Sequence, residues 1–375
     1  MKREEKTVMT EQINEKAARE LRELYHSFGY TQYRMSKFEE YELYMENKDF
    51  IGARGIISFT DTDGRLLALK PDVTLSIIKS VRQANGVQKV FYHENVYRVS
   101  HGSGTFRESP QCGLECIGDV GPYEIGEVLY LAVRSLALFD RPFRLVLSHL
   151  ELVSALIGAA GFENEMRADC LRLIKAKNAD GLRELADAAG IPRKKAEPLI
   201  GAIRLYGTPD EVLPRLTALT ADCPAAQTPL GELSSLCRLL TEKGFAEETA
   251  IDLSVVNDMD YYSGVVFRGY LDGLPEGVLS GGCYDRMMQK MGRVCGAVGF
   301  AVSLDRLDGL PAPETGRDCD ILLLYEQEDS PETVLDCVCR LTAAGYTVRA
   351  ASRVPDGLRY GKRLTVKEAE EGSVC

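Results

Sequence analysis

Apolar residues recur three or four positions apart near the start of the chain, at Ile13, Ala17, Leu21, Leu24 and Phe28. This spacing predicts an amphipathic helix, with Thr10 as its N-cap and Gly29 just past its end. The following residues, 30–50, are expected to be extended and then helical.

Short alternating runs come next and predict paired strands. Residues 56–70 contain two short apolar runs split by Asp63-Gly64, which is a strong hairpin signal. A helix is expected from Thr74 to Asn85. Beyond it, the pattern predicts a strand from Lys89 to Arg98 and an antiparallel partner from Phe106 to Ile117, joined by a loop.

The middle of the chain is dominated by helical patterns. A helix is expected from Pro122 to Phe139 and a short strand from Phe143 to Leu147. Residues 151–246 are interpreted as a block of small helices. Because strand patterns resume on both sides of this block, we interpret it as an insertion.

Strand patterns return between residues 251 and 307. Residues 253–256 are expected to form one short strand and Tyr261–Leu271 a second, rich in aromatic and β-branched side chains. Gly281-Gly282 indicate a turn or a close approach of two backbones.

The last part of this stretch, AVGFAVSLDRL, ends at Leu307 and is apolar almost throughout. We interpret it as a buried helix. It contains Asp305 and Arg306, and a buried arginine requires an anionic partner. From these residues alone, a structural ion pair with Asp305 or a neighbour is favoured over a bound anionic ligand.

A linker rich in proline and glycine follows Leu307 and is typical of a domain boundary. A strand from Cys319 to Tyr325, a helix from Pro331 to Ala344 and a strand from Tyr346 to Ala351 then form one βαβ unit. We therefore expect two domains, residues 1–310 and 317–375, the second small and with a marginal core.

Composition narrows the class of protein. The chain has 375 residues, 45% hydrophobic and 27% charged, with a formal net charge of -11 that disfavours non-specific nucleic-acid binding. Its 11 cysteines form no CxxC pair or zinc motif, so we expect reduced thiols, no metal and no cofactor. The N-terminus lacks a signal-peptide pattern and no run approaches 18 apolar residues. A soluble cytoplasmic protein without membrane contact is expected.

Polar side chains gather on the predicted strand pair 89–117. Arg107, Gln111 and Glu115 are separated by even steps, so they share one face of a strand, with Arg98 across the loop. Asp72 and Thr74 stand at a strand-to-helix junction. Together these groups suit a free amino acid, with carboxylates for its ammonium group and arginines for an anion. The alternative is a solvated face whose charges pair across strands, and composition alone favours it.

Four motifs in order carry a resemblance to a known family. RESPQCGLECIG, DMDYYSGVVF, SGGCYDRMMQKMG and AVGFAVSLDRL resemble the catalytic domain of class II histidyl-tRNA synthetases, and FTDTDGRLLALKPDVT resembles their amino-group site. The resemblance covers about residues 10–307. It implies an α+β fold with an antiparallel six- or seven-stranded sheet flanked by helices, normally as a dimer. Residues 317–375 would then be a truncated, small α/β relative of the anticodon-binding domain.

The resemblance also assigns roles to residues. It implies that histidine is held by residues matching Asp72, Thr74, Gln111, Glu115, Tyr261, Tyr262 and Tyr284. It implies that ATP phosphates meet arginines matching Arg98 and Arg306, which supplies the anion for Arg306. Ordinary strand packing is the alternative explanation of the tyrosines.

Several positions depart from the synthetase pattern. An arginine at the scissile α-phosphate is expected just before DYY, where Asn257 stands; Ser100 replaces a glutamate that orients ATP, and Thr105 a loop arginine. Cys283 replaces an arginine beside the motif tyrosine, and Ser36 replaces a proline at the dimer interface. Because losing one transition-state charge costs about 10²- to 10³-fold in rate, adenylation chemistry is expected to be absent.

A histidine pocket without adenylation chemistry is similar to the regulatory subunits of ATP phosphoribosyltransferase, inactive paralogues of the synthetases. This resemblance implies a non-catalytic subunit required by a short-form catalytic subunit in the first step of L-histidine biosynthesis. It also implies L-histidine as an effector, a dimer, and no bound tRNA. Whether histidine binds in the pocket or at a subunit interface stays open. The alternatives are an active histidyl-tRNA synthetase and an interaction scaffold with a vestigial pocket.

Overall fold

The computed structural model describes residues 2–47, 55–80, 86–99, 104–162, 164–256, 261–310 and 317–371, with the backbone alone for 2–13. The chain divides into two compact units, Met1–Leu310 and Pro311–Cys375. Each unit is described by itself. None of the helices in the described ranges is both long enough and apolar enough to span a membrane.

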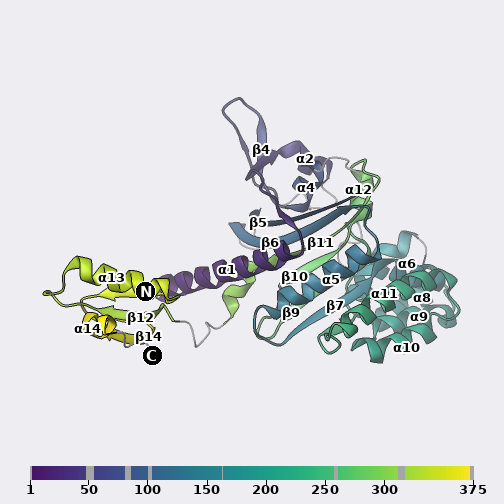
Figure 1. Ribbon diagram of the computed structural model, residues 1–375. Helices are drawn as coiled ribbons and strands as arrows, with labels where there is room; N and C mark the ends of the chain where they lie inside the picture. The colour runs from purple at the N-terminus through teal and green to yellow at the C-terminus, as the bar shows by residue number, and fades with distance from the viewer. Residues whose placement is uncertain are drawn as a thin grey trace. The chain divides into compact units, whose positions relative to one another are not determined.

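The first unit is built on an eight-stranded sheet with the order β1-β5-β6-β11-β10-β9-β7-β8 (Figure 1). Its strands are β1 (Thr31–Gln32), β5 (Val87–Val99), β6 (Phe106–Gly118), β7 (Phe143–His149), β8 (Thr249–Ile251), β9 (Ser263–Leu271), β10 (Leu279–Cys283) and β11 (Gly296–Ser303). The six central strands pair antiparallel, which confirms the expected fold class. The sheet has more strands than the expected six or seven because two very short strands, β1 and β8, pair in parallel at its edges.

The two faces of this sheet carry different cores. Helices α1 (Lys2–Ser27) and α5 (Pro122–Ala137) lie along one face, where Phe91 and Leu114 belong to the larger core. The other face packs against α4 (Thr74–Ser80) and α12 (Asp285–Lys290), with Tyr92 and Ile117 in a smaller core. Neighbouring strand residues therefore serve opposite cores, as the pleat requires.

A small antiparallel sheet stands beside α4 on the second face. The order of its strands is β2-β4-β3, and they span β2 (Phe38–Glu40), β3 (Ser58–Thr60) and β4 (Leu66–Leu69). Helix α2 (Tyr41–Glu46) follows β2, and α4 follows β4. The predicted hairpin at Asp63-Gly64 is confirmed, with Gly64 in the left-handed conformation that its turn requires.

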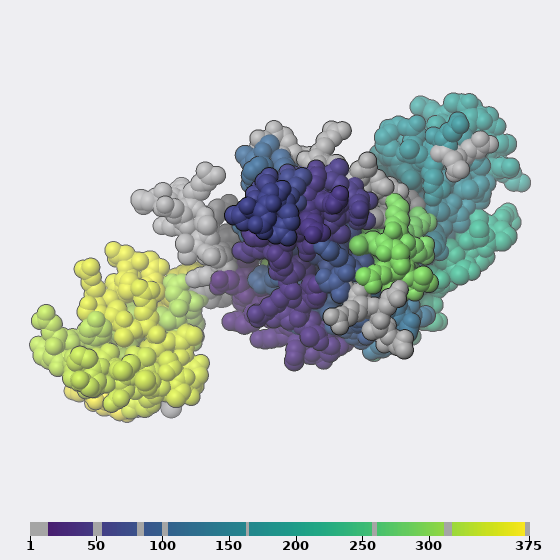
Figure 2. Space-filling view, turned by 90° about the horizontal axis from the view of Figure 1, so that it is seen from above, coloured from purple at the N-terminus to yellow at the C-terminus, as the bar shows by residue number. Residues whose placement is uncertain are grey.

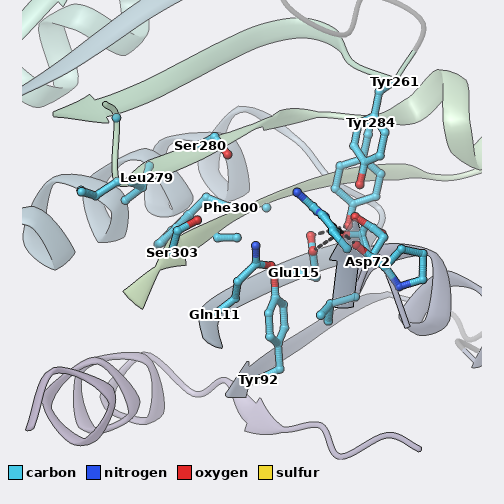
Figure 3. Close-up of a pocket in the computed structure, with 18 of the residues that line it drawn as sticks. Asp72, Tyr92, Gln111, Glu115, Tyr261, Leu279, Ser280, Tyr284, Phe300 and Ser303 are labelled. Carbon is cyan, nitrogen blue, oxygen red and sulfur yellow. Dashed lines mark hydrogen bonds between the residues drawn. The ribbon is translucent and has the colours of Figure 1, made fainter. Parts of the chain in front are cut away.

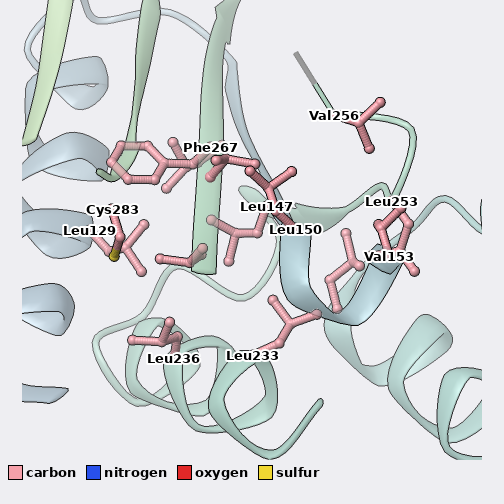
Figure 4. Packing of buried hydrophobic residues seen from close by; sticks show 14 of the residues in the cluster. Leu129, Leu147, Leu150, Val153, Leu233, Leu236, Leu253, Val256, Phe267 and Cys283 are labelled. Carbon is pink, nitrogen blue, oxygen red and sulfur yellow. The ribbon is translucent and has the colours of Figure 1, made fainter. Parts of the chain in front are cut away.

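Residues between β7 and β8 form a helical block, which is the teal lobe in Figure 2. Its helices are α6 (Leu150–Ala160), η2 (Asn164–Met166), α7 (Arg167–Lys175), α8 (Ala179–Ala188), α9 (Arg193–Ile203), α10 (Pro209–Leu219) and α11 (Pro224–Glu242). Leu233 and Leu236 of α11 face Leu147 of the sheet and Val153 of α6 (Figure 4), so the block shares the larger core.

Three local expectations were wrong. Helix α1 extends from Lys2, so Thr10 lies inside it and not at its N-cap position. The short strand is β8, a few residues before 253–256, where the chain makes a turn at 253–254 and forms no strand. AVGFAVSLDRL is the strand β11 followed by a single 3₁₀ segment, η3 (Leu304–Gly309), because a continuous apolar run suits a buried strand as well as a buried helix. The expected helix that begins at Thr74 is confirmed as far as Ser80, and its expected end at Asn85 lies outside the described residues.

The second unit is a three-stranded parallel sheet of order β13-β12-β14 with helices packed on it. Its elements are β12 (Cys319–Leu324), α13 (Pro331–Ala343), β13 (Val348–Ala351), β14 (Tyr360–Thr365) and α14 (Val366–Glu370). The expected βαβ unit is present, whereas β14 and α14 were not predicted. A small core of seven buried side chains, including Leu323 and Leu364, holds it together.

Candidate functional site

A cavity of about 780 Å³ lies on the second face of the sheet, between β5, β6, β10 and β11 and the start of α4. All nine candidate side chains from the sequence line it, namely Asp72, Thr74, Arg98, Gln111, Glu115, Tyr261, Tyr262, Tyr284 and Arg306. Arg107, which shares the strand face of Gln111 and Glu115, does not line it. Of the three evenly spaced polar residues on β6, two therefore line the cavity.

Glu115 lies beside Asp72 in the cavity lining (Figure 3), and we call this part of the cavity the acid end. Its carboxyl accepts hydrogen bonds from Thr74 Oγ1 and from the Tyr284 hydroxyl, both at 2.6 Å, and its side chain is only 2% exposed. Burial raises the pKa of Glu115 to about 8, an effect that the two hydrogen bonds oppose. Without a cation beside it, this carboxyl is therefore largely protonated at neutral pH.

Asp72 supplies a second carboxyl to this end. Its Oδ1 accepts the Leu75 backbone N–H at 2.9 Å, which fixes the side chain at the start of α4. Burial raises the pKa of Asp72 as well, and its negative charge contributes to the raised pKa of Glu115. Two desolvated acids in one cavity favour a ligand with a compact positive charge, such as an ammonium group.

Tyrosine rings form the wall above the acids. The ring centroids of Tyr261 and Tyr262 are 4.6 Å apart, and those of Tyr261 and Tyr284 are 6.1 Å apart. Tyr92 was not predicted, although it shares a face of β5 with Arg98 and the same even-step argument would have found it.

Glycine backbones form part of the floor. A Cβ on Gly299 would lie 1.8 Å from Glu115 Oε2, so any side chain there would displace the carboxyl. A Cβ on Gly281 would lie 2.4 Å from the Gly299 carbonyl oxygen, in agreement with the expected close backbone approach.

Arginines line the other end of the cavity, where Leu279, Ser280 and Ser303 also lie (Figure 3). Arg98 donates from Nε to the Pro71 carbonyl at 3.1 Å, and Arg306 pairs with Glu276 at 3.4 Å and donates to the Gly277 carbonyl. Arg306 is 42% exposed, so the expectation that it is buried was wrong. Asp305 pairs with Arg107 at 2.9 Å instead of with Arg306, because it projects from η3 toward the start of β6.

Three of the five positions that depart from the synthetase pattern lie in the described part of the chain. Cys283 is buried, and burial raises its thiol pKa, so the position carries no charge. Ser36 Oγ accepts the Phe38 backbone N–H, and Thr105 precedes β6. Asn257 and Ser100 lie outside the described residues. Within the described ranges, no three His, Cys, Asp or Glu side chains could hold a metal ion together.

Comparisons with known proteins agree on one family. A family model described as histidyl-tRNA synthetase matches residues 7–307. A curated relative from Clostridium kluyveri, named ATP phosphoribosyltransferase regulatory subunit, is 28% identical over 83% of this chain and 82% of its own length.

Two solved structures share the fold. A Bacillus halodurans structure described as an ATP phosphoribosyltransferase regulatory subunit/histidyl-tRNA synthetase is 25% identical, with a TM-score of 0.78 over 94% of both chains. A chain of the ATP phosphoribosyl transferase (HisG:HisZ) complex from Thermotoga maritima is similar with a TM-score of 0.62. At 21% identity, covering 77% of this chain and 96% of that one, the second shows likeness of fold alone.

Proposed function

This chain belongs to the histidyl-tRNA synthetase family, and we propose that within it the chain is the non-catalytic regulatory subunit of an ATP phosphoribosyltransferase. Its partner is the short-form catalytic subunit, which condenses ATP with phosphoribosyl pyrophosphate in the first step of L-histidine biosynthesis. The names of the relatives from Clostridium kluyveri and Bacillus halodurans support this assignment.

The observation that carries the proposal is the environment of Glu115. The carboxyl is held by two hydroxyl donors beside Asp72 and under a tyrosine wall, in a cavity large enough for an amino acid. The protein keeps this costly buried acid, whose pKa is raised, where an ammonium group would be recognised. We therefore propose L-histidine as the ligand and effector. Seven cavity side chains would hold it, namely Asp72, Thr74, Gln111, Glu115, Tyr261, Tyr262 and Tyr284, whereas Arg98 and Arg306 form a separate candidate anion site.

The lost charges argue against adenylation. Neutral residues, Asn257 and Cys283, stand where the synthetase pattern has arginines, and Ser100 stands where it has a glutamate. Each missing transition-state charge costs about 10²- to 10³-fold in rate. A chain that binds histidine without activating it can signal histidine abundance to a partner enzyme.

For regulation, histidine must bind two states of the assembly unequally, because a ligand with equal affinity for both shifts nothing. We propose a homodimer, as in the synthetases, that binds the catalytic subunit and no tRNA. The cysteines at described positions are free thiols, which fits the reducing cytoplasm as the compartment.

Co-expression tests the proposal. A short-form catalytic subunit is assayed for phosphoribosyl-ATP formation alone and with this chain, and activity is expected only for the pair. Added L-histidine is expected to lower that activity. Activity of the lone catalytic subunit that this chain leaves unchanged would contradict the proposal.

The same preparation distinguishes the alternative, an active histidyl-tRNA synthetase. Histidine-dependent exchange of pyrophosphate into ATP by the purified chain alone would establish adenylation and would contradict the proposal of a non-catalytic subunit. An interaction scaffold would support phosphoribosyl-ATP formation and yet show no heat of histidine binding in calorimetry.

A further inference from the structure

The hydroxyl of Tyr92 is a buried polar group of the cavity that no role has yet been given. Tyr92 lies on β5, lines the cavity and is only 1% exposed. Its hydroxyl makes no hydrogen bond within the described part of the chain, whereas the hydroxyls of Thr74 and Tyr284 donate to Glu115. A buried hydroxyl without a partner is costly, because it has given up its hydrogen bonds to water. Its place in the cavity lining therefore indicates a partner that the ligand supplies.

The backbone of β6 makes room for this hydroxyl. Tyr92 pairs with Gly113 across the ribbon, and a Cβ on Gly113 would lie 2.5 Å from the Tyr92 hydroxyl oxygen. The ring therefore lies over the space that a side chain at Gly113 would occupy. Glu115 repeats the arrangement one strand further along the sheet, because its carboxyl lies over Gly299 of β11. Two glycines thus allow side chains of neighbouring strands to form the floor of the cavity.

The Tyr92 hydroxyl fills a gap in a row of polar groups along β6. Gln111, Gly113 and Glu115 share one face of the strand, at steps of roughly 6.5 Å. Gly113 has no side chain, so the Tyr92 hydroxyl stands between the Gln111 amide and the Glu115 carboxyl (Figure 3). The Gln111 amide, like the Tyr92 hydroxyl, has no hydrogen bond among the described residues. A ligand whose ammonium group meets Glu115 and whose side chain extends along β6 reaches the Tyr92 hydroxyl next.

A hydroxyl at this place suits a ring that contains nitrogen. Burial raises the pKa of Tyr92 well above its ordinary value, so the hydroxyl stays neutral and can both donate and accept a hydrogen bond. A neutral imidazole has one nitrogen that donates and one that accepts, so it pairs with a hydroxyl in either direction. An apolar ring of the same size would leave the hydroxyl unpaired, and a site built for a hydrogen bond rejects a ligand that cannot make it.

We propose that Tyr92 determines the specificity of the cavity, with its hydroxyl hydrogen-bonded to the imidazole ring of a histidine whose ammonium group is held at the acid end. This inference rests on the proposed function, because it requires histidine in the cavity. It adds a contact to the seven side chains of the candidate histidine site. Rejection of apolar amino acids of similar size, such as phenylalanine, then depends on this hydroxyl.

The test compares L-histidine with L-thienylalanine, whose five-membered ring is similar in size to imidazole and contains no nitrogen. Calorimetry on the full-length protein is expected to show that Tyr92→Phe weakens histidine binding about 10-fold, the effect of losing one hydrogen bond. The same variant should bind thienylalanine at least as tightly as the unaltered protein does, because no hydroxyl is left unpaired. Its free energy of unfolding without ligand should not fall, for the same reason.

Tyr97→Phe is the matched control. Tyr97 lies on the other face of β5, outside the cavity lining, and its hydroxyl donates to Glu108 at 3.0 Å. This variant should bind both ligands as the unaltered protein does.

Three results would overturn the inference. Unchanged histidine affinity in Tyr92→Phe would show that the hydroxyl does not contact the ligand. Equal losses for histidine and thienylalanine, or a lower stability of the variant without ligand, would show that the hydroxyl has a structural role. Failure of thienylalanine to bind either protein would show that selection does not depend on this hydroxyl. Absence of histidine binding by the unaltered protein would remove the proposed function as well, which keeps the two failures distinguishable.

Discussion

The two ends of the cavity differ in how tightly the protein holds its polar groups. At the acid end, the Glu115 carboxyl is buried and hydrogen-bonded through both oxygens. At the arginine end, Arg306 is partly exposed and is held by a backbone carbonyl and an exposed glutamate. A rigid, desolvated end selects one ligand group, whereas a solvated end contributes little to selectivity. This difference is consistent with our proposal that the acid end binds an amino acid, and we propose that the arginine end is a former phosphate site.

The strongest test of the comparison is to remove the buried acid. Glu115→Ala is expected to weaken L-histidine binding by about 2–3 kcal/mol, or about 30- to 150-fold, because the ammonium group loses a desolvated partner. Calorimetry on the isolated chain measures the affinity for L-histidine. Glu23→Ala, at an exposed position of α1, is the control. An unchanged affinity would mean that the cavity is vestigial.

An effect that is smaller per pH unit is expected on stability, from titration of the same carboxyl group. In the fold the pKa of Glu115 is about 8, against an ordinary 4.5, so between these values the folded protein holds a proton that the unfolded chain has released. The free energy of unfolding without ligand should therefore fall as pH rises from about 5 to about 8, by up to about 1.4 kcal/mol per pH unit.

Denaturant titrations at several pH values measure this slope. Glu115→Gln keeps the shape of the side chain and removes its titration, so the slope should flatten in the variant. Parallel curves for the two proteins would show that Glu115 does not titrate in this range.

Removing one hydrogen bond at the acid end should have an effect of about 1 kcal/mol. Tyr284→Phe keeps the ring contact with Tyr261 and deletes the hydroxyl that donates to Glu115. Histidine affinity should fall about fivefold. Tyr123→Phe deletes a hydroxyl that donates to Glu127, a residue that does not line the cavity, and serves as the control. Equal losses in both variants would indicate a general effect on folding.

The smallest effect is expected at the arginine end. Arg306→Ala should change histidine affinity by less than about 0.5 kcal/mol, because a partly exposed ion pair contributes little. A loss as large as that of Glu115→Ala would break the comparison and would show that the two ends act as one site.

The residues of the acid end were easier to predict from the sequence than the type and bounds of the surrounding elements, and the reason is physical. Even spacing along a strand fixes the face of Gln111 and Glu115 without further information. It does not say how far along the ribbon the cavity extends, so Arg107 was grouped with them, although it pairs with Asp305.

Elsewhere the local signal was ambiguous. The eight residues of β11, which are apolar or small, fit a buried strand or a buried helix equally, and only pairing with β6 and β10 decides between them. Strand β14 was missed because Lys362 and Arg363 break its apolar pattern, and its place beside β12 comes from tertiary pairing. Tyr92 was within reach of the even-step rule.

The parallel pairing of β7 with β8 has a consequence for how the molecule can vary. A chain that leaves the end of one strand must travel back along the sheet before it can enter a parallel neighbour, so a tight turn cannot join them. The helical block is the crossover connection between β7 and β8. Shortening it is limited to what a dozen or so residues can still span, whereas lengthening it costs only slowly increasing loop entropy. The helical block can therefore grow or change shape during evolution, but its complete loss would also remove the edge strand β8 from the sheet.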